Sequence, residues 1–141
     1  MPLFESMSQS LLNHVFGGTD FSRPATLHLG LSTTAITGAG GNITEPSGAA
    51  GYARVPITNN ATNFPASTVV GGKAIKRNGT VITFPEATGS WGTVTHWFLS
   101  SAATGGTLIA YGALGTSRSV VALDIPRFSA NDLEIRVAPV S

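Results

Sequence analysis

From residue 26 onwards, the chain is a series of short segments in which apolar and polar residues alternate, separated by glycine, proline, asparagine and aspartate. In residues 26–32, three leucines lie on one face and His28 and Gly30 on the other, which is typical of a half-buried β-strand. No βαβ rhythm follows, so the pattern does not indicate a doubly wound α/β fold. The sequence predicts a mainly β fold, an antiparallel, jelly-roll-like β-sandwich, and leaves an immunoglobulin-like strand order open.

The turn-forming residues between these segments set the expected strand boundaries. Asn78-Gly79 predicts a hairpin turn, Pro56 predicts a strand at a sheet edge, and Gly115 predicts the end of a strand. Residues 33–50 have no periodicity, and loops of this length usually have a function. We expect strands over residues 26–32, 52–58, 74–75, 80–84, 93–99, 107–114, 119–125 and 133–137, with 93–99 central.

The N-terminus has a different period. Apolar residues recur there at steps of three and four and form one stripe of a helix, comprising Leu3, Phe4, Met7, Leu11 and Val15. Gly17-Gly18 ends the helix, which predicts an amphipathic helix in residues 1–18 and one β-sandwich domain in residues 19–141. A helix of about 12 residues is marginal alone, so its stripe must dock on the sandwich or on another subunit.

Composition excludes several classes of protein. The chain has 141 residues and no cysteine, which excludes disulfides and thiolate metal sites. Charged residues make up 11% of the chain and the net charge is +1, so no nucleic-acid partner is expected. No apolar run is long enough to cross a membrane. So few charges suit a surface that partners cover in an assembly, although a Thr- and Ser-rich exterior without partners would also fit.

Residues able to perform chemistry are few and scattered. His14, His28 and His96 lack the spacing of metal ligands, and no GxSxG motif or phosphate-binding loop is present. The sequence predicts no catalytic residue, no metal and no cofactor, although two distant carboxylates could still meet in the fold. Arg54 and the other dispersed arginines suit pairing with a carboxylate on a partner. Trp91 and Trp97 are expected in the core or an interface, with a sugar platform as the alternative.

Several stretches resemble a family of small tailed-bacteriophage virion proteins. The similarity covers residues 11–137, through the runs 11–19, 23–33, 51–55, 81–97, 102–114 and 128–135. Members of this family include tail fibre proteins and capsid cement, or decoration, proteins. Within the family, the sequence resembles the cement proteins of short-tailed Bordetella phages.

The resemblance implies a capsid cement protein made in the bacterial cytoplasm and bound to the outer surface of the virion head. Its expected partners are the major capsid protein and itself, with a homodimer favoured over a trimer. The chain lacks the long repeats of fibres, which favours cement over the alternative, a tail fibre or polysaccharide-binding adhesin. We expect the contacts to involve the loop 33–50 and the residues Leu3, Phe4, Met7, Leu11, Val15 and Arg54.

Overall fold

The computed structural model describes residues 3–137. Its elements in chain order are α1 (Glu5–Val15), β1 (Thr26–Ser32), the 3-10 turn η1 (Gly48–Ala50), β2 (Val55–Thr58), β3 (Thr68–Val70), β4 (Lys73–Arg77), β5 (Ile82–Thr83), β6 (Gly92–Ser100), β7 (Leu108–Val120), β8 (Arg127–Phe128) and β9 (Glu134–Val137). Residues 1–2 of the expected helix and residues 138–141 of the expected sandwich domain lie outside this described range.

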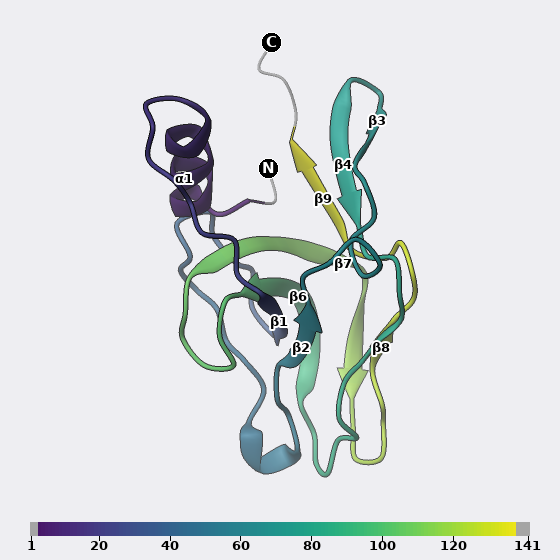
Figure 1. Cartoon of the computed structure of the whole chain (residues 1–141). Helices are drawn as coiled ribbons and strands as arrows, with labels where there is room; N and C mark the ends of the chain where they lie inside the picture. The colour runs from purple at the N-terminus through teal and green to yellow at the C-terminus, as the bar shows by residue number, and fades with distance from the viewer. Residues whose placement is uncertain (1–2, 138–141) are drawn as a thin grey trace.

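The architecture is a mainly β, antiparallel sandwich with one short N-terminal helix, as the sequence predicts (Figure 1). The largest sheet has the order β2-β1-β6-β7, so β6 is central and β2, with Pro56, is an edge strand. Smaller sheets of order β3-β4-β9 and β5-β8 complete the fold. No helix within residues 3–137 is long and apolar enough to span a membrane.

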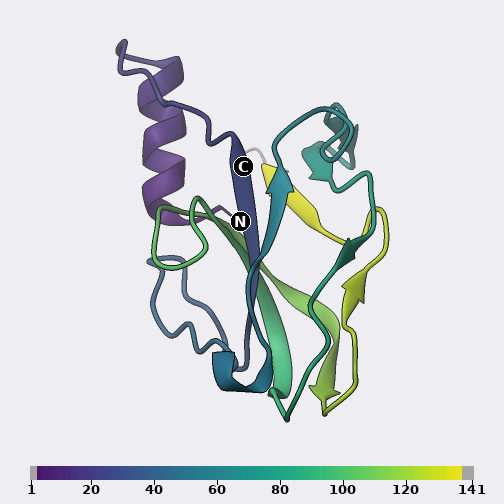
Figure 2. The same cartoon turned by 60° about the horizontal axis from the view of Figure 1, so that its bottom comes forward.

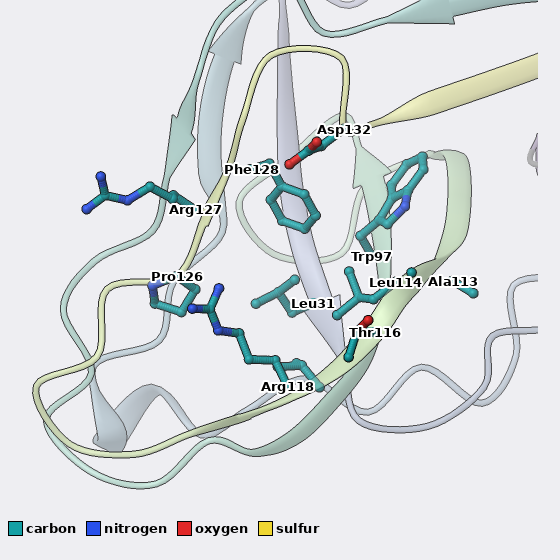
Figure 3. A pocket seen from close by; sticks show the side chains of 12 residues that line it. Leu31, Trp97, Ala113, Leu114, Thr116, Arg118, Pro126, Arg127, Phe128 and Asp132 are labelled. Atoms are coloured by element: carbon teal, nitrogen blue, oxygen red, sulfur yellow. The ribbon is translucent and has the colours of Figure 1, made fainter.

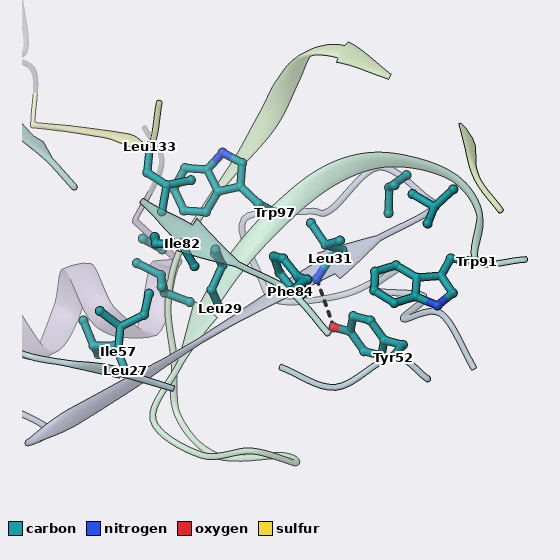
Figure 4. Close-up of a cluster of buried hydrophobic side chains, with 14 of the residues drawn as sticks. Leu27, Leu29, Leu31, Tyr52, Ile57, Ile82, Phe84, Trp91, Trp97 and Leu133 are labelled. Atoms are coloured by element: carbon teal, nitrogen blue, oxygen red, sulfur yellow. Dashed lines mark hydrogen bonds between the residues drawn. The ribbon is translucent and has the colours of Figure 1, made fainter. Parts of the chain in front are cut away.

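The main core lies between the four-stranded sheet and the layer that contains β5 and β8. Leu27, Leu29 and Leu31 project from β1 into this core because alternate residues of a strand share a face. Figure 4 shows these leucines beside Ile57 and Trp97, with residues of the second layer opposite them, among them Ile82, Phe84 and Leu133.

A second, smaller core covers the outer face of the same sheet. It contains Phe4 and Met7 from the helix, Ile36 from the long loop and Phe98 from β6. The ring of Phe98 covers Gly30 on the neighbouring strand, since a Cβ atom at Gly30 would be 2.3 Å from Cζ of the ring. The glycine on the polar face of β1 therefore makes room for the aromatic ring that the helix covers.

The prediction of a hairpin turn at Asn78-Gly79 is wrong. The strands on its two sides belong to different sheets, because β4 pairs with β3 and β9 whereas β5 pairs with β8. The tight hairpin turn in this region is Gly71-Gly72, where both glycines have positive φ, and it joins β4 to β3, a strand that the sequence analysis does not predict. Asn78 is buried instead, and its side chain bonds the backbone of Thr80, Ser129 and Leu133.

The prediction that a strand ends at Gly115 is also wrong. β7 continues to Val120, so residues 119–125 form no separate strand. Its pairing with β6 jumps from His96–Ala113 to Val94–Arg118, so residues 114–117 bulge away from β6. Glycine inside a strand often marks such a bulge. Gly115 thus signals an irregularity in the strand, not its end.

Candidate functional site

The helix stripe divides into a buried and an exposed half. Phe4 and Met7 are buried against Phe98, and Leu3 pairs with Ala110 at the edge of β7. Leu11 and Val15, from the same stripe, are exposed. The structure therefore separates the five helix residues expected in a contact with another protein: three contribute to the fold of the chain itself and two remain accessible.

The exposed half forms an apolar surface at the end of the helix. This surface, here called the helix patch, comprises Leu11, Leu12, Val15 and Phe16. Leu12 is 58% exposed, Val15 61% and Phe16 69%. In Figure 2, α1 rises from the sheet at its N-terminal end, and the patch lies toward the far end of the helix. Adjacent apolar side chains this exposed are typical of a surface that another molecule covers.

Arg54 contacts a carboxylate of its own chain. Its Nε and Nη2 atoms donate to the two carboxylate oxygens of Glu45, at 2.9 and 3.0 Å, and its side chain is 7% exposed. Nη1 donates to the backbone oxygens of Ala102 and Gly105. The guanidinium also lies 4.9 Å from the ring centroid of Phe98. Arg54 therefore connects the long loop to the turn between β6 and β7.

Tyr52 extends this ion pair into the core. Its hydroxyl donates to Oε1 of Glu45 at 2.6 Å and accepts the amide of Leu31 at 3.0 Å (Figure 4). Burial alone would raise the pKa of Glu45, but the hydrogen bonds from Arg54 and Tyr52 outweigh it and lower that pKa. Burial, together with the bond to Glu45, raises the pKa of Tyr52. The cluster is an ionised carboxylate held by a cation and a neutral phenol.

The long loop, an expected contact region, is ordered by internal bonds. The buried hydroxyl of Ser32 accepts the amides of Thr34 and Thr44 and donates to the oxygen of Thr34. Ile36 is buried in the second core and Ile43 packs beside it. The loop 33–50 thus covers the outer face of the sheet with the helix, and its remaining polar residues form its exposed side.

Two of the three histidines form hydrogen bonds with nearby residues. His14 accepts the amide of Phe21, and His96 shares a hydrogen bond with Thr95. The buried Nδ1 of His28 has no hydrogen-bond partner within residues 3–137. No group of three histidines or carboxylates in that range is arranged to hold a metal ion.

The two tryptophans have different surroundings. Trp91 is buried between Tyr52 and Phe84, and its indole donates to the oxygen of Ala50 at 2.8 Å. Trp97 is only 3% exposed, but it lines a cavity of about 370 Å³ between β7 and residues 126–132 (Figure 3). This space is here called the β7 cavity. Trp97, one of the two candidate sugar platforms, therefore lies at the β7 cavity.

The bulge in β7 forms one wall of the β7 cavity. Leu114, Gly115 and Thr116 belong to the bulge, and Arg118 follows it. The space is also lined by residues of the segment 126–132 and by three buried core residues, namely Pro126, Arg127, Phe128, Asp132, Leu31, Val94 and Trp97. The sequence analysis does not single out this set, because its members come from four separate segments. Gly115, at the bulge, and Trp97 are the members of this set that the sequence analysis names.

Comparison with known proteins identifies the class of protein. The sequence from residue 3 to residue 136 matches the family described as podophage GP4 fiber I protein gp80. A search of curated proteins found no match. The family description supports a structural role in a phage particle and agrees with the resemblance to tailed-phage virion proteins. Because the match extends over nearly the whole chain, this protein belongs to the podophage GP4 fiber I family of phage virion proteins.

Proposed function

We propose that this protein is a non-catalytic fibre subunit of a podophage virion. The observation that carries this proposal is the family match, which covers residues 3–136 and so includes both the helix and the sandwich. The described chain is one small sandwich without a long shaft. A fibre made from such a unit would depend on contacts with other virion proteins or with further copies of the chain.

The helix patch is the surface that we assign to this attachment. Leu11, Leu12, Val15 and Phe16 are adjacent, exposed and apolar. Burial of apolar surface contributes about 25 cal/mol per Å², so this patch would give attraction without a charged partner. Contacts of this kind suit a chain in which 11% of residues are charged.

A second candidate is a capsid cement protein on the outer surface of the head. The compact sandwich, without repeats, favours this role, because a small domain can lie across a joint between two copies of the major capsid protein. Two modest contacts made by one domain, or by a homodimer, hold more tightly than either alone because the second contact forms at high local concentration. The resemblance to the cement proteins of short-tailed Bordetella phages belongs to this alternative.

The copy number of the protein in purified virions discriminates between the two candidates. A fibre predicts far fewer copies than the major capsid protein, whereas a cement protein predicts a comparable number. The measurement is quantitative mass spectrometry of intact particles, with the portal protein as the internal low-copy standard. A chain absent from virions and active on a substrate in solution would contradict both candidates.

A further inference from the structure

We propose that the three-stranded sheet β3-β4-β9 binds an acidic, extended segment of another protein. The inference goes beyond the proposed function, because this surface is made of other elements than the helix patch and either virion role could use it. Three observations carry it: an excess of positive charge in the sheet, a groove across one of its faces, and an unpaired strand edge beside that groove.

Positive charge is concentrated in this sheet. Four of the eight lysines and arginines of the chain lie in β4 and β9, together with one of its seven acidic residues, Glu134. The sheet therefore has a net charge of +3, whereas the remainder of the chain, with four basic and six acidic residues, has a net charge of −2. A local excess of one sign attracts a partner of the opposite sign, even when the net charge of the whole protein is close to zero.

A groove of about 260 Å³ crosses one face of the sheet, here called the groove face. Alternate residues of a strand share a face, so all three strands contribute to the lining, namely Val70, Gly71, Lys73, Ile75, Arg77, Glu134 and Arg136. Ile75 is buried, whereas Val70 is 52% exposed. The groove face therefore offers accessible apolar surface next to cationic side chains.

The cations of the groove face are only partly neutralised within the chain. Glu134 accepts hydrogen bonds from both Arg77 and Arg136, so two guanidinium groups share one carboxylate. Their side chains remain 38% and 49% exposed, respectively. Lys73 is exposed and forms no ion pair within residues 3–137. The groove face thus has a surplus of positive charge that carboxylates of a partner can pair with.

β3 is an edge strand, and its outer side is unpaired in the described part of the chain (Figure 1). The two-residue turn Gly71-Gly72 joins Val70 to Lys73, and such a turn closes a pair of residues that exchange both backbone hydrogen bonds. The next pair, Val69 with Ala74, is then a non-hydrogen-bonded pair, so the N–H and C=O of Val69 point away from β4. Val69 is 75% exposed, and β3 contains no charge or proline that would block pairing with a further strand.

An extended acidic peptide uses all of these features at once. A segment that adds as a strand beside β3 would bond the N–H and C=O of Val69, and every second side chain of the segment would lie on the groove face. Neighbouring strands are about 4.8 Å apart, so Lys73 is two strand spacings from the added strand. An extended lysine and a glutamate can meet across that gap above Val70, whose apolar surface they would cover.

A nucleic acid or a second copy of the chain fits less well. A nucleic acid would gain nothing from the edge of β3, and with so few cations its binding would be weak at physiological salt. Pairing of two β3 edges about a two-fold axis would place two sheets of charge +3 side by side, which is unfavourable.

The probe is a blocked peptide of sequence Glu-Thr-Glu-Val-Glu-Thr-Glu, in which alternation places all the carboxylates on one face of a strand. The same peptide with Gln in place of every Glu is the charge control. Binding to the full chain is followed through backbone amide signals in ¹H–¹⁵N NMR spectra at low salt. We expect the Val69 amide, which would gain a hydrogen bond, to shift with a Kd on the order of 1 mM, and the Gln peptide to bind about fivefold more weakly.

The contribution of charge is tested with two lysines of the same strand. Lys73→Gln removes an exposed cation of the groove face and should weaken binding of the Glu peptide about fivefold. Lys76→Gln is the matched control, because residue 76 lies on the opposite face of β4, and it should change the Kd by less than about twofold.

The contribution of the strand edge is tested from both sides. Val69→Pro removes the outward N–H and leaves the hydrogen bonds between β3 and β4 in place, so binding, followed through the Val70 amide, should weaken at least about fivefold. Unchanged amide signals of β4 and β9 show that the sheet of this variant is intact. A Glu peptide that is N-methylated at its central Val should bind more weakly to the wild-type chain, which tests the same edge without altering the protein.

Each of the following results would overturn the proposal: no binding of the Glu peptide at millimolar concentrations, equal binding of the Glu and Gln peptides, equal effects of Lys73→Gln and Lys76→Gln, or tighter binding of a thymidine oligonucleotide than of the Glu peptide. A Val69 signal that shifts with protein concentration alone would indicate that β3 pairs with a second copy, and would overturn it as well. None of these results changes the copy number in virions, so this inference and the proposed function fail separately.

Discussion

At the scale of single residues, Arg54 shows how one side chain can organise several segments. It bonds Glu45 in the long loop and two carbonyl oxygens in the turn after β6, and it stacks on Phe98. A planar guanidinium with five N–H donors makes all these contacts at once, which the point charge of lysine does not. The contacts hold the loop and the β6–β7 turn against the same sheet.

Replacement of Arg54 by methionine should destabilise the protein strongly. The Glu45 carboxylate would lose its cation while remaining partly buried, and removal of one partner of such a pair costs about 3 kcal/mol. The free energy of unfolding, measured in urea, should fall by about that amount. The double variant Arg54→Met, Glu45→Gln should recover part of the loss, because no uncompensated charge remains.

The matched control is Arg23→Met, which changes an exposed arginine. It should alter the free energy of unfolding by no more than about 0.5 kcal/mol. Equal effects of the Arg54 and Arg23 substitutions would show that the internal ion pair contributes nothing to stability.

At the scale of elements, α1 combines two roles along one stripe. Its first turns bury Phe4 and Met7 over Phe98, and its last turn presents the helix patch. Because residues three and four apart lie on one side of a helix, the same periodicity generates both the buried and the exposed residues. The buried residues lie on the turns next to the sheet, and the exposed residues lie on the turns farther from it.

Substitutions in the two halves of α1 should therefore separate folding from attachment. Met7→Ala should lower the free energy of unfolding by about 2–5 kcal/mol, because it leaves a cavity in the second core. Leu12→Ser combined with Val15→Ser should leave stability within about 1 kcal/mol of the wild type, since both residues are exposed. The same double variant should be depleted from purified virions, measured by quantitative mass spectrometry.

Normal incorporation of the Leu12→Ser, Val15→Ser variant would exclude the helix patch from the attachment surface. Thr19→Ala, beyond the end of the helix, is the control that should be incorporated like the wild type.

At the scale of the whole molecule, a few of the charged side chains form ion pairs within the chain. Glu45 holds Arg54, and Glu134 of β9 bonds Arg77 of β4 at 3.1 Å and Arg136 of its own strand. The hydrogen bond from Arg77 is the main reason that the pKa of Glu134 is lowered, and the pKa of Glu45 is lowered as well. Glu45 connects the long loop to Arg54, whereas Glu134 joins two neighbouring strands of the three-stranded sheet.

This arrangement predicts loss of stability in acid. A carboxyl group whose pKa is lower in the folded than in the unfolded state stabilises the fold above its ordinary pKa of 4.5, and that contribution disappears as pH falls through the folded value. The free energy of unfolding should therefore be nearly constant from neutral pH to about pH 5 and should fall below pH 4.5. Urea unfolding at a series of pH values measures this dependence.

Glu45→Gln should reduce the acid-dependent part of the loss, because the group that takes up the proton is absent. The control Glu86→Gln removes an exposed carboxyl that forms no ion pair within residues 3–137, and it should keep the wild-type dependence. An identical pH dependence in wild type and Glu45→Gln would contradict the assignment to this cluster.

The short-range pattern of the sequence was sufficient for much of the fold. Alternation identified β1 and the central strand β6, and the three- and four-residue spacing with Gly17-Gly18 identified α1. These features were predictable because each depends only on residues that are neighbours in the chain. The resemblance to phage virion proteins, carried by runs across the chain, agrees with the family match. The copy number in virions discriminates between a fibre and a capsid role.

Tertiary structure decided which segments meet. Asn78 has the signature of a hairpin, but the pairing of β4 with β9 and of β5 with β8 makes it a buried connector. Arg54 was expected to bind a partner, but folding brings Glu45 to it. The β7 cavity forms where the bulge of β7 lies beside residues 126–132, which belong to another segment of the chain. Local patterns predict which residues are buried. The order of the strands in each sheet, which brings distant segments together, depends on the packing of the whole chain.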